Sequence, residues 1–180
     1  MPKADPKDLR FGERPLTPGE TRLARGLFGD RIDLDRVRIV RRRRGRFAYV
    51  IGSRIHFPPG PPADFRDAPV EHQAWLMHEL THVWQFQTQP FRTLWSWLGV
   101  LLGGGYSRGL PGYRYALPLR PFREHNLEQQ ARIVQHVFLL SRGARCPTMP
   151  PGASLAHYQD TAFLRQALDS MDKADDPADA

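Results

Sequence analysis

Apolar residues recur at helical spacing in several stretches of this chain. The first stretch holds Leu23, Leu27 and Phe28, which fall on one face of a helix with 3.6 residues per turn. The preceding Thr17-Pro18-Gly19-Glu20 places Thr at the N-cap, Pro at the first helical position and Glu at the third, which is a capping box. We therefore predict a helix over residues 18–28.

The longest helical pattern runs from Ala68 to about Phe86 and is carried by Val70, Ala74, Met77, Leu80 and Trp84. Three further helices are predicted after it. They are a short apolar helix at Thr93–Leu102, a helix from an Asn126 cap to Ser141, and a helix from a Ser154 cap to about Met171.

Alternation of apolar and polar residues predicts strands in the region between the first two helices. Val37 and Ile39 alternate with arginines between Asp35 and Arg44, as in a strand with one wet face. Residues 47–51 and 53–57 flank Gly52 and predict a hairpin or a bent strand. Since strands and helices are segregated along the chain, we predict an α+β fold with a small antiparallel or mixed sheet followed by helices.

The chain length of 180 residues fits one domain with a substantial core. We expect a flexible N-terminal arm over residues 1–15, one domain over 16–171 and a disordered acidic tail over 172–180. The single cysteine, Cys146, excludes an internal disulfide framework and a cysteine-based zinc finger. Any metal site must therefore be built from histidine and carboxylate.

The distribution of charge is uneven. The formal net charge is +7, and arginines at residues 41–44 and 46 form a dense cationic run. This run suits a phosphate contact, but a solvated strand end explains it as well, and no aromatic residues are interleaved for base stacking. We therefore do not expect a nucleic-acid partner.

The polar N-terminus shows no apolar signal-peptide core, and the longest apolar run, at residues 98–102, is far shorter than a membrane span. We expect synthesis in the cytoplasm without a signal peptide and no transmembrane segment.

The residues that carry chemistry are His78-Glu79-Leu80-Thr81-His82, an HExxH motif inside the long predicted helix. Two histidines four residues apart lie on one helical face and can bind the same zinc ion. Glu79 follows the first of them and can take a proton from metal-bound water.

A catalytic zinc site needs three protein ligands and one open position. Glu128 is the best third ligand, because it lies 46 residues after His82 in the first turn of another predicted helix. Glu124, His125 and His136 are rivals for this role.

Two segments give the sequence a specific resemblance. Residues 78–85 read HELTHVWQ and residues 126–131 read NLEQQA. This pair resembles the zincin metallopeptidases of the gluzincin type, which combine HExxH with a downstream Glu. More narrowly, it resembles Vgr-related proteins, the metallopeptidase extensions of type VI secretion spike proteins, and HELTH-containing domains of contractile injection systems. The matches span about residues 47–140, including a strand segment at 51–58.

The resemblance implies a zinc peptidase with His78, His82 and Glu128 as ligands and Glu79 as the general base. The position before Asn126 is often Tyr in this group and is His125 here, which leaves open the group that stabilises the oxyanion. Candidates for it are Tyr113, Tyr115 and His125. We expect the substrate to be a peptide or protein that adds to a strand edge within residues 47–57.

The same resemblance implies export by a type VI-like secretion system, an effector or toxin role, spike or injection components as partners, and a cognate immunity protein. Two alternatives remain. A DNA-associated SprT-like HExxH protease would account for the basic charge, although that group usually takes a third histidine. A non-catalytic adaptor could retain zinc only to stabilise its fold.

Overall fold

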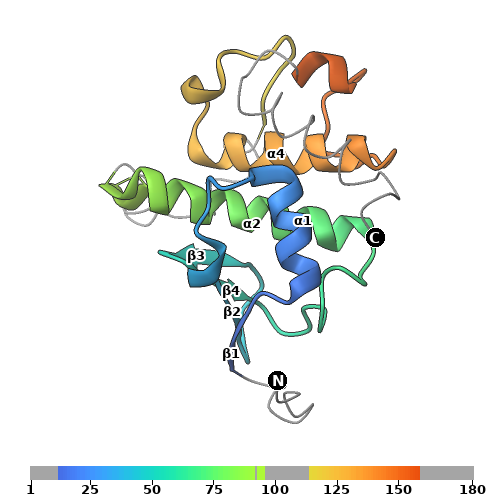
Figure 1. Ribbon diagram of the computed structural model, residues 1–180. Coiled ribbons are helices and arrows are strands. Elements are labelled where there is room, and N and C mark those ends of the chain that lie inside the picture. Colours follow the sequence, from blue (N-terminus) through green and yellow to red (C-terminus); the bar gives the residue numbers. More distant parts are fainter. Residues whose placement is uncertain (1–11, 92, 96–113, 159–180) are drawn as a thin grey trace.

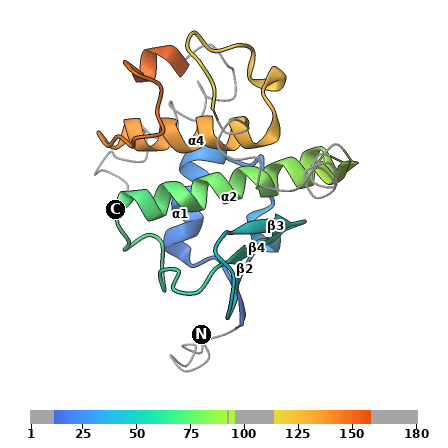
Figure 2. The same cartoon turned by 180° about the vertical axis from the view of Figure 1, so that it is seen from behind.

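A computed structural model describes residues 12–91, 93–95 and 114–158 (Figure 1). Helix α2 (Val70–Thr88) lies between the sheet and helix α4 (Leu127–Ser141) in both views (Figures 1 and 2). Helix α1 (Pro18–Phe28) packs beside them. No helix within these residues is long and apolar enough to cross a bilayer.

The sheet has four strands in the order β1-β2-β4-β3, namely β1 (Glu13–Pro15), β2 (Arg38–Arg41), β4 (Arg54–Phe57) and β3 (Tyr49–Ile51). β2 and β4 are parallel, and the two outer pairs are antiparallel. β3 and β4 form a hairpin whose turn contains Gly52 at φ 59°, a conformation that glycine adopts without a steric penalty. The predicted α+β class with a mixed sheet is confirmed at this level.

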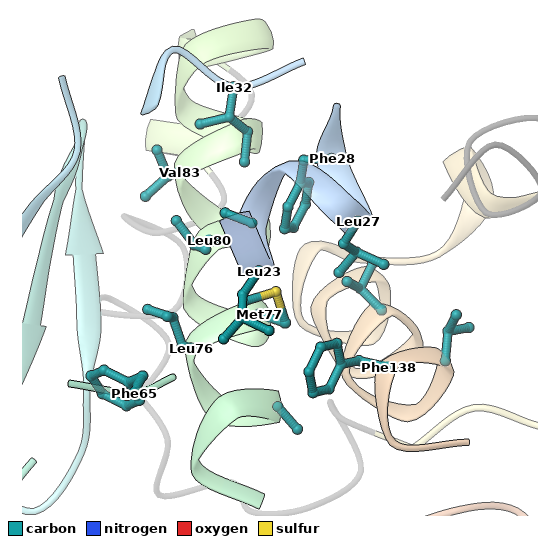
Figure 3. Close-up of a cluster of buried hydrophobic side chains, with 14 of the residues drawn as sticks. Leu23, Leu27, Phe28, Ile32, Phe65, Leu76, Met77, Leu80, Val83 and Phe138 are labelled. Carbon is teal, nitrogen blue, oxygen red and sulfur yellow. The ribbon is translucent and has the colours of Figure 1, made fainter. Parts of the chain in front are cut away.

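Helix α2 is buried on two sides, which explains why apolar residues occur nearly all round it. Figure 3 shows Leu76, Leu80 and Val83 facing the strands, whereas Met77 lies among side chains of α1 and α4. All four of these side chains are fully buried. Because each buried aliphatic side chain contributes about 1.5–3 kcal/mol, this helix is the centre of the core.

The observed helices begin at or near the residues predicted from the sequence. Thr17 and Glu20 form the predicted capping box of α1, and Asn126 caps α4. The predicted helix over 68–86 is observed at Val70–Thr88. Residues 93–95 are helical, whereas the rest of the helix predicted to residue 102 lies outside the described residues. The helix predicted from Ser154 appears as a 3-10 helix at Leu155–Tyr158, and its continuation also lies outside them.

Two predictions at the N-terminal side are corrected. Glu13–Pro15, placed in the flexible arm, forms β1 because it pairs with β2. The strand predicted over 35–44 is confined to Arg38–Arg41. Residues Leu34–Arg36 form a 3-10 turn instead, since the Val37 N–H bonds to the Leu34 carbonyl and Arg38 donates to the Asp35 carbonyl.

A buried carboxylate ties the start of α1 to the loop before α2. Glu20 is fully buried and accepts two hydrogen bonds of 2.7 Å from the Arg14 guanidinium. It also accepts hydrogen bonds from the backbone N–H groups of Thr17 and Phe65. Every oxygen of this carboxylate therefore has a charged and a neutral donor, as burial of an ion pair requires.

Glu20→Ala should lower the free energy of unfolding by about 3–5 kcal/mol, since it leaves the Arg14 charge without its buried partner. Glu13→Ala, which removes the half-exposed carboxylate bound to Arg54, should cost about 1 kcal/mol or less. Urea unfolding of both variants measures the difference. Equal losses would contradict the structural role assigned to Glu20.

Candidate metal centre

The middle of α2 brings His78, Glu79 and His82 together, as the HExxH spacing predicts. The imidazole rings of His78 and His82 lie one turn apart, with centroids separated by 5.0 Å. His78 and Glu79 are buried, and His82 is partly buried. The two imidazoles therefore share one helical face at the contact with α4.

Glu128 reaches this face from the first turn of α4. The turn is fixed by a capping box in which the Asn126 side chain accepts from the Gln129 N–H, and the Gln129 side chain accepts from the Asn126 N–H. Glu128 Oε2 lies 3.6 Å from His78 Nε2 and 3.5 Å from His82 Nε2. The three side chains form a group whose ligand atoms all lie within 4.8 Å of one another.

These separations fit a shared metal ion better than a hydrogen bond. An N–H···O hydrogen bond spans about 2.7–3.2 Å. In a tetrahedral site with metal–ligand bonds of about 2.0–2.2 Å, neighbouring ligand atoms lie about 3.3–3.6 Å apart. Both distances from Glu128 fall in the second range. Two imidazoles and a carboxylate are also a donor set that zinc takes in catalytic sites.

Glu128 and His82 shift each other's pKa values in opposite directions. Burial alone would raise the pKa of Glu128, but the adjacent imidazoles of His82 and His78 hold it well below its usual range. Burial alone would lower the pKa of His82, whereas the Glu128 carboxylate raises it to about 9. Without a metal, the site thus stabilises positive charge next to Glu128, which is where a cation would be held.

Glu79 sits beside the two histidines, and its carboxylate is held by a neighbouring indole. Trp75 Nε1 donates to Glu79 Oε1 at 3.1 Å, while the Trp75 ring packs edge-on against Phe57 at 4.8 Å. Burial raises the pKa of Glu79, and the charges of the neighbouring histidines oppose that shift. Such a shift moves a carboxylate towards the range in which it accepts and returns protons near neutral pH. Trp75, which is partly buried and packs against the core, therefore also contacts the predicted base.

The rivals for the third ligand are placed differently. Glu124 is exposed on a short 3-10 helix before α4. His136 is buried, and both its ring nitrogens are engaged, Nδ1 with the Tyr115 hydroxyl at 2.5 Å and Nε2 with Thr148 at 3.1 Å. His125 is buried, with Nδ1 3.3 Å from Gln129 Oε1. Neither histidine belongs to the group that Glu128 completes.

The predicted oxyanion donors differ in whether their polar atoms already have hydrogen-bond partners. The Tyr115 hydroxyl contacts both His136 and the Tyr158 hydroxyl, at 2.8 Å from the latter. Within the described residues, His125 Nε2 is buried without a hydrogen-bond partner. Tyr113 lies outside the described residues.

One residue of this neighbourhood, Gln85, was not predicted from the sequence. Its side chain is fully buried and contacts His82 Nδ1 at 2.8 Å. The available signal was a polar residue three positions after the second histidine on a helix whose apolar residues predict burial. A buried amide of this kind must find hydrogen-bond partners.

His136 should make the protein lose stability in mild acid. Burial, then Arg132 and His78, lower its pKa to about 3, whereas an unfolded histidine has a pKa of about 6.5. The unfolded chain therefore binds the extra proton below pH 6.5, and stability falls as pH decreases from there. Between pH 7 and pH 5 the loss from this group is about 2 kcal/mol.

Urea unfolding across this range in wild type, His136→Asn and the exposed control His72→Asn measures that contribution. The His136 variant should show a shallower fall in stability than the wild type, and the His72 variant an unchanged one. Identical slopes in all three proteins would contradict the assignment.

The chain is similar in sequence to a known protein. No protein-family model matches it. It is 35% identical over 142 residues to the type VI secretion system spike protein VgrG2b of Pseudomonas aeruginosa, and the match covers 70% of this chain but 13% of that protein. The chain thus spans a small part of the relative's length.

A solved structure corresponds to much of the chain. It is described as the effector domain of Pseudomonas aeruginosa VgrG2b, with 33% sequence identity and a TM-score of 0.55. The similarity covers 75% of this chain and 78% of the solved one. The agreement extends over both sequence and fold, and this chain belongs to the family of the VgrG2b effector domain.

Proposed function

We propose that this chain is a zinc-dependent peptidase that acts as a type VI secretion effector. The observation that carries the proposal is the convergence of His78 Nε2, His82 Nε2 and Glu128 Oε2, with the Glu128 oxygen 3.6 and 3.5 Å from the two nitrogens. The HExxH glutamate, Glu79, lies beside them within hydrogen-bonding distance of Trp75. Family membership supports the effector role.

In this proposal His78, His82 and Glu128 would hold the zinc ion. Zinc, when bound, would lower the pKa of its water to about 7 and polarise the peptide carbonyl. Glu79 would accept a proton from the attacking water and return it to the leaving amine. Trp75 keeps the Glu79 carboxylate oriented through its indole N–H.

Among the predicted oxyanion donors, we favour His125. Its Nε2 makes no hydrogen bond within the described part of the chain. Because Nδ1 faces the acceptor Gln129 Oε1, Nε2 would donate to a substrate oxygen only when both ring nitrogens carry a hydrogen. The Tyr115 hydroxyl, by contrast, is already shared between His136 and Tyr158.

The secretion part of the proposal rests on the relatives. The matching protein is a type VI spike, and the matching structure is its effector domain. We infer that this chain is exported from the cytoplasm in association with spike components and acts on a peptide or protein target. A cognate immunity protein remains a prediction from the resemblance.

Glu79→Gln should abolish hydrolysis and leave zinc binding intact, because Glu79 moves a proton and is not a ligand. We expect a loss of about 10³-fold in the cleavage rate of labelled denatured casein or of a peptide library. Atomic absorption should still measure one zinc per chain. The matched control Glu124→Gln alters an exposed glutamate and should keep wild-type activity.

Full activity in the Glu79 variant would overturn the mechanism. Zinc bound by the wild type with no hydrolysis of any peptide in the library would instead favour a non-catalytic zinc protein.

A further inference from the structure

We propose that Gln85 and Gln130 form a buried amide relay that fixes the tautomer of His82 and connects this ligand to the backbone that carries Glu128. The hydrogen-bond relay stands on the contacts below, and its effect on zinc binding rests on the proposed function. Neither glutamine is a ligand or a catalytic residue. Both are positioning residues, fully buried between α2 and α4, with 0% and 1% exposure.

The far end of the relay is oriented by two carbonyl groups. Gln130 Nε2 donates to the backbone carbonyls of Phe122 at 3.0 Å and His125 at 3.2 Å. A carbonyl only accepts hydrogen bonds, so the amide nitrogen of Gln130 must face these two groups. Its Oε1 atom therefore points the other way, towards Gln85.

The orientation of Gln85 follows from the same reasoning. Its Nε2 donates to the Leu127 carbonyl at 3.0 Å and to Gln130 Oε1 at 3.0 Å. Both amide hydrogens are thereby used, and both partners are acceptors. Gln85 Oε1 is left facing His82 Nδ1 at 2.8 Å.

The tautomer of His82 is the consequence. Since Gln85 Oε1 can only accept, His82 Nδ1 must carry a hydrogen and donate it. In the neutral ring, Nε2 is then the nitrogen with a free lone pair, and Nε2 is the atom that faces Glu128 at 3.5 Å. Three backbone carbonyls thus determine which nitrogen of His82 can bind a metal.

The relay also links two ligands that are distant in sequence. The Leu127 carbonyl that receives the Gln85 hydrogen bond belongs to the peptide bond immediately before Glu128. His82 and the backbone of Glu128 are therefore held by one side chain. His78 lacks such support, because within the described residues its Nδ1 is buried without a hydrogen-bond partner.

Gln85→Met keeps the length of the side chain but cannot donate to Leu127 or Gln130. We expect zinc affinity, measured by competition with a chromophoric chelator, to fall about 10–100-fold, the loss typical for groups that orient metal ligands. The matched control is Gln87→Met, on the same helix, whose amide bridges Asp33 and Ser53 instead. It should keep wild-type affinity even if its thermal stability falls.

Gln85→Glu separates positioning from general stability. Its carboxylate still accepts from His82 Nδ1 but faces the Leu127 and Gln130 oxygens without a hydrogen to give. We expect a melting temperature below that of Gln85→Met but a smaller loss of zinc affinity than in that variant, because the His82 tautomer is kept while the link to the Leu127 carbonyl is lost. A purely structural role for Gln85 predicts instead that the less stable of the two variants also loses more affinity.

Proton NMR of the zinc-free protein provides a second readout, which does not depend on metal binding. The His82 Nδ1–H signal should exchange slowly with water in wild type and Gln87→Met, and quickly in Gln85→Met. Fast exchange in the wild type, or wild-type zinc affinity in folded Gln85→Met, would overturn the relay. A slow Nδ1–H signal in a protein that binds no zinc would uphold the relay and reject the proposed function.

Discussion

Helix α2 is enclosed between the sheet and α4, and this enclosure constrains every polar group on its buried positions. An unsatisfied buried donor or acceptor costs about 1–3 kcal/mol, so polar residues at these positions must find partners inside the protein. Glu79 bonds to Trp75, and Gln85 bonds to His82 and to α4. Glu79 and Gln85 are thus satisfied by neighbours that also orient them, whereas His78 Nδ1 has no hydrogen-bond partner among the described residues.

The contact between α2 and α4 brings together the three residues of the candidate metal site, which come from two short segments of the sequence. HExxH spacing alone aligns two imidazoles, but a third ligand has to come from 46 residues further along the chain. The capping box at Asn126 fixes where α4 begins, and Glu128 follows in its first turn. Glu128 can therefore serve as a ligand only if α4 packs on α2 in this register, which the buried amides of Gln85 and Gln130 hold in place.

Local signals in the sequence predicted much of this arrangement. The capping box at Thr17, the Asn126 cap, the hairpin around Gly52 and the helix that carries HExxH were all predictable, because each depends on residues close together in the chain. The position of Glu128 beside the two histidines was predictable because its motif pairs with HELTH in the family that the sequence resembles. The role of Glu13–Pro15 as β1 was not, since three residues of strand are stabilised only by pairing with β2.

Other features of the site were also beyond sequence reasoning. The two hydrogen bonds of His136 depend on Tyr115 and Thr148, which lie on separate segments. The orientation of Gln85 depends on the carbonyl of Leu127, a backbone atom whose position no side-chain pattern encodes. Contacts between segments that are distant in sequence therefore determine which polar residues face the candidate metal site and which are packed in the core.

The most direct test of the central claim is the zinc content and affinity of the wild-type chain beside Glu128→Ala and the exposed control Glu124→Ala. We expect one zinc per chain in wild type and in the Glu124 variant, with zinc affinity reduced at least about 100-fold when the third ligand is removed. Absence of zinc from the wild type, or unchanged affinity in Glu128→Ala, would contradict a metal centre built by the packing of α4 on α2.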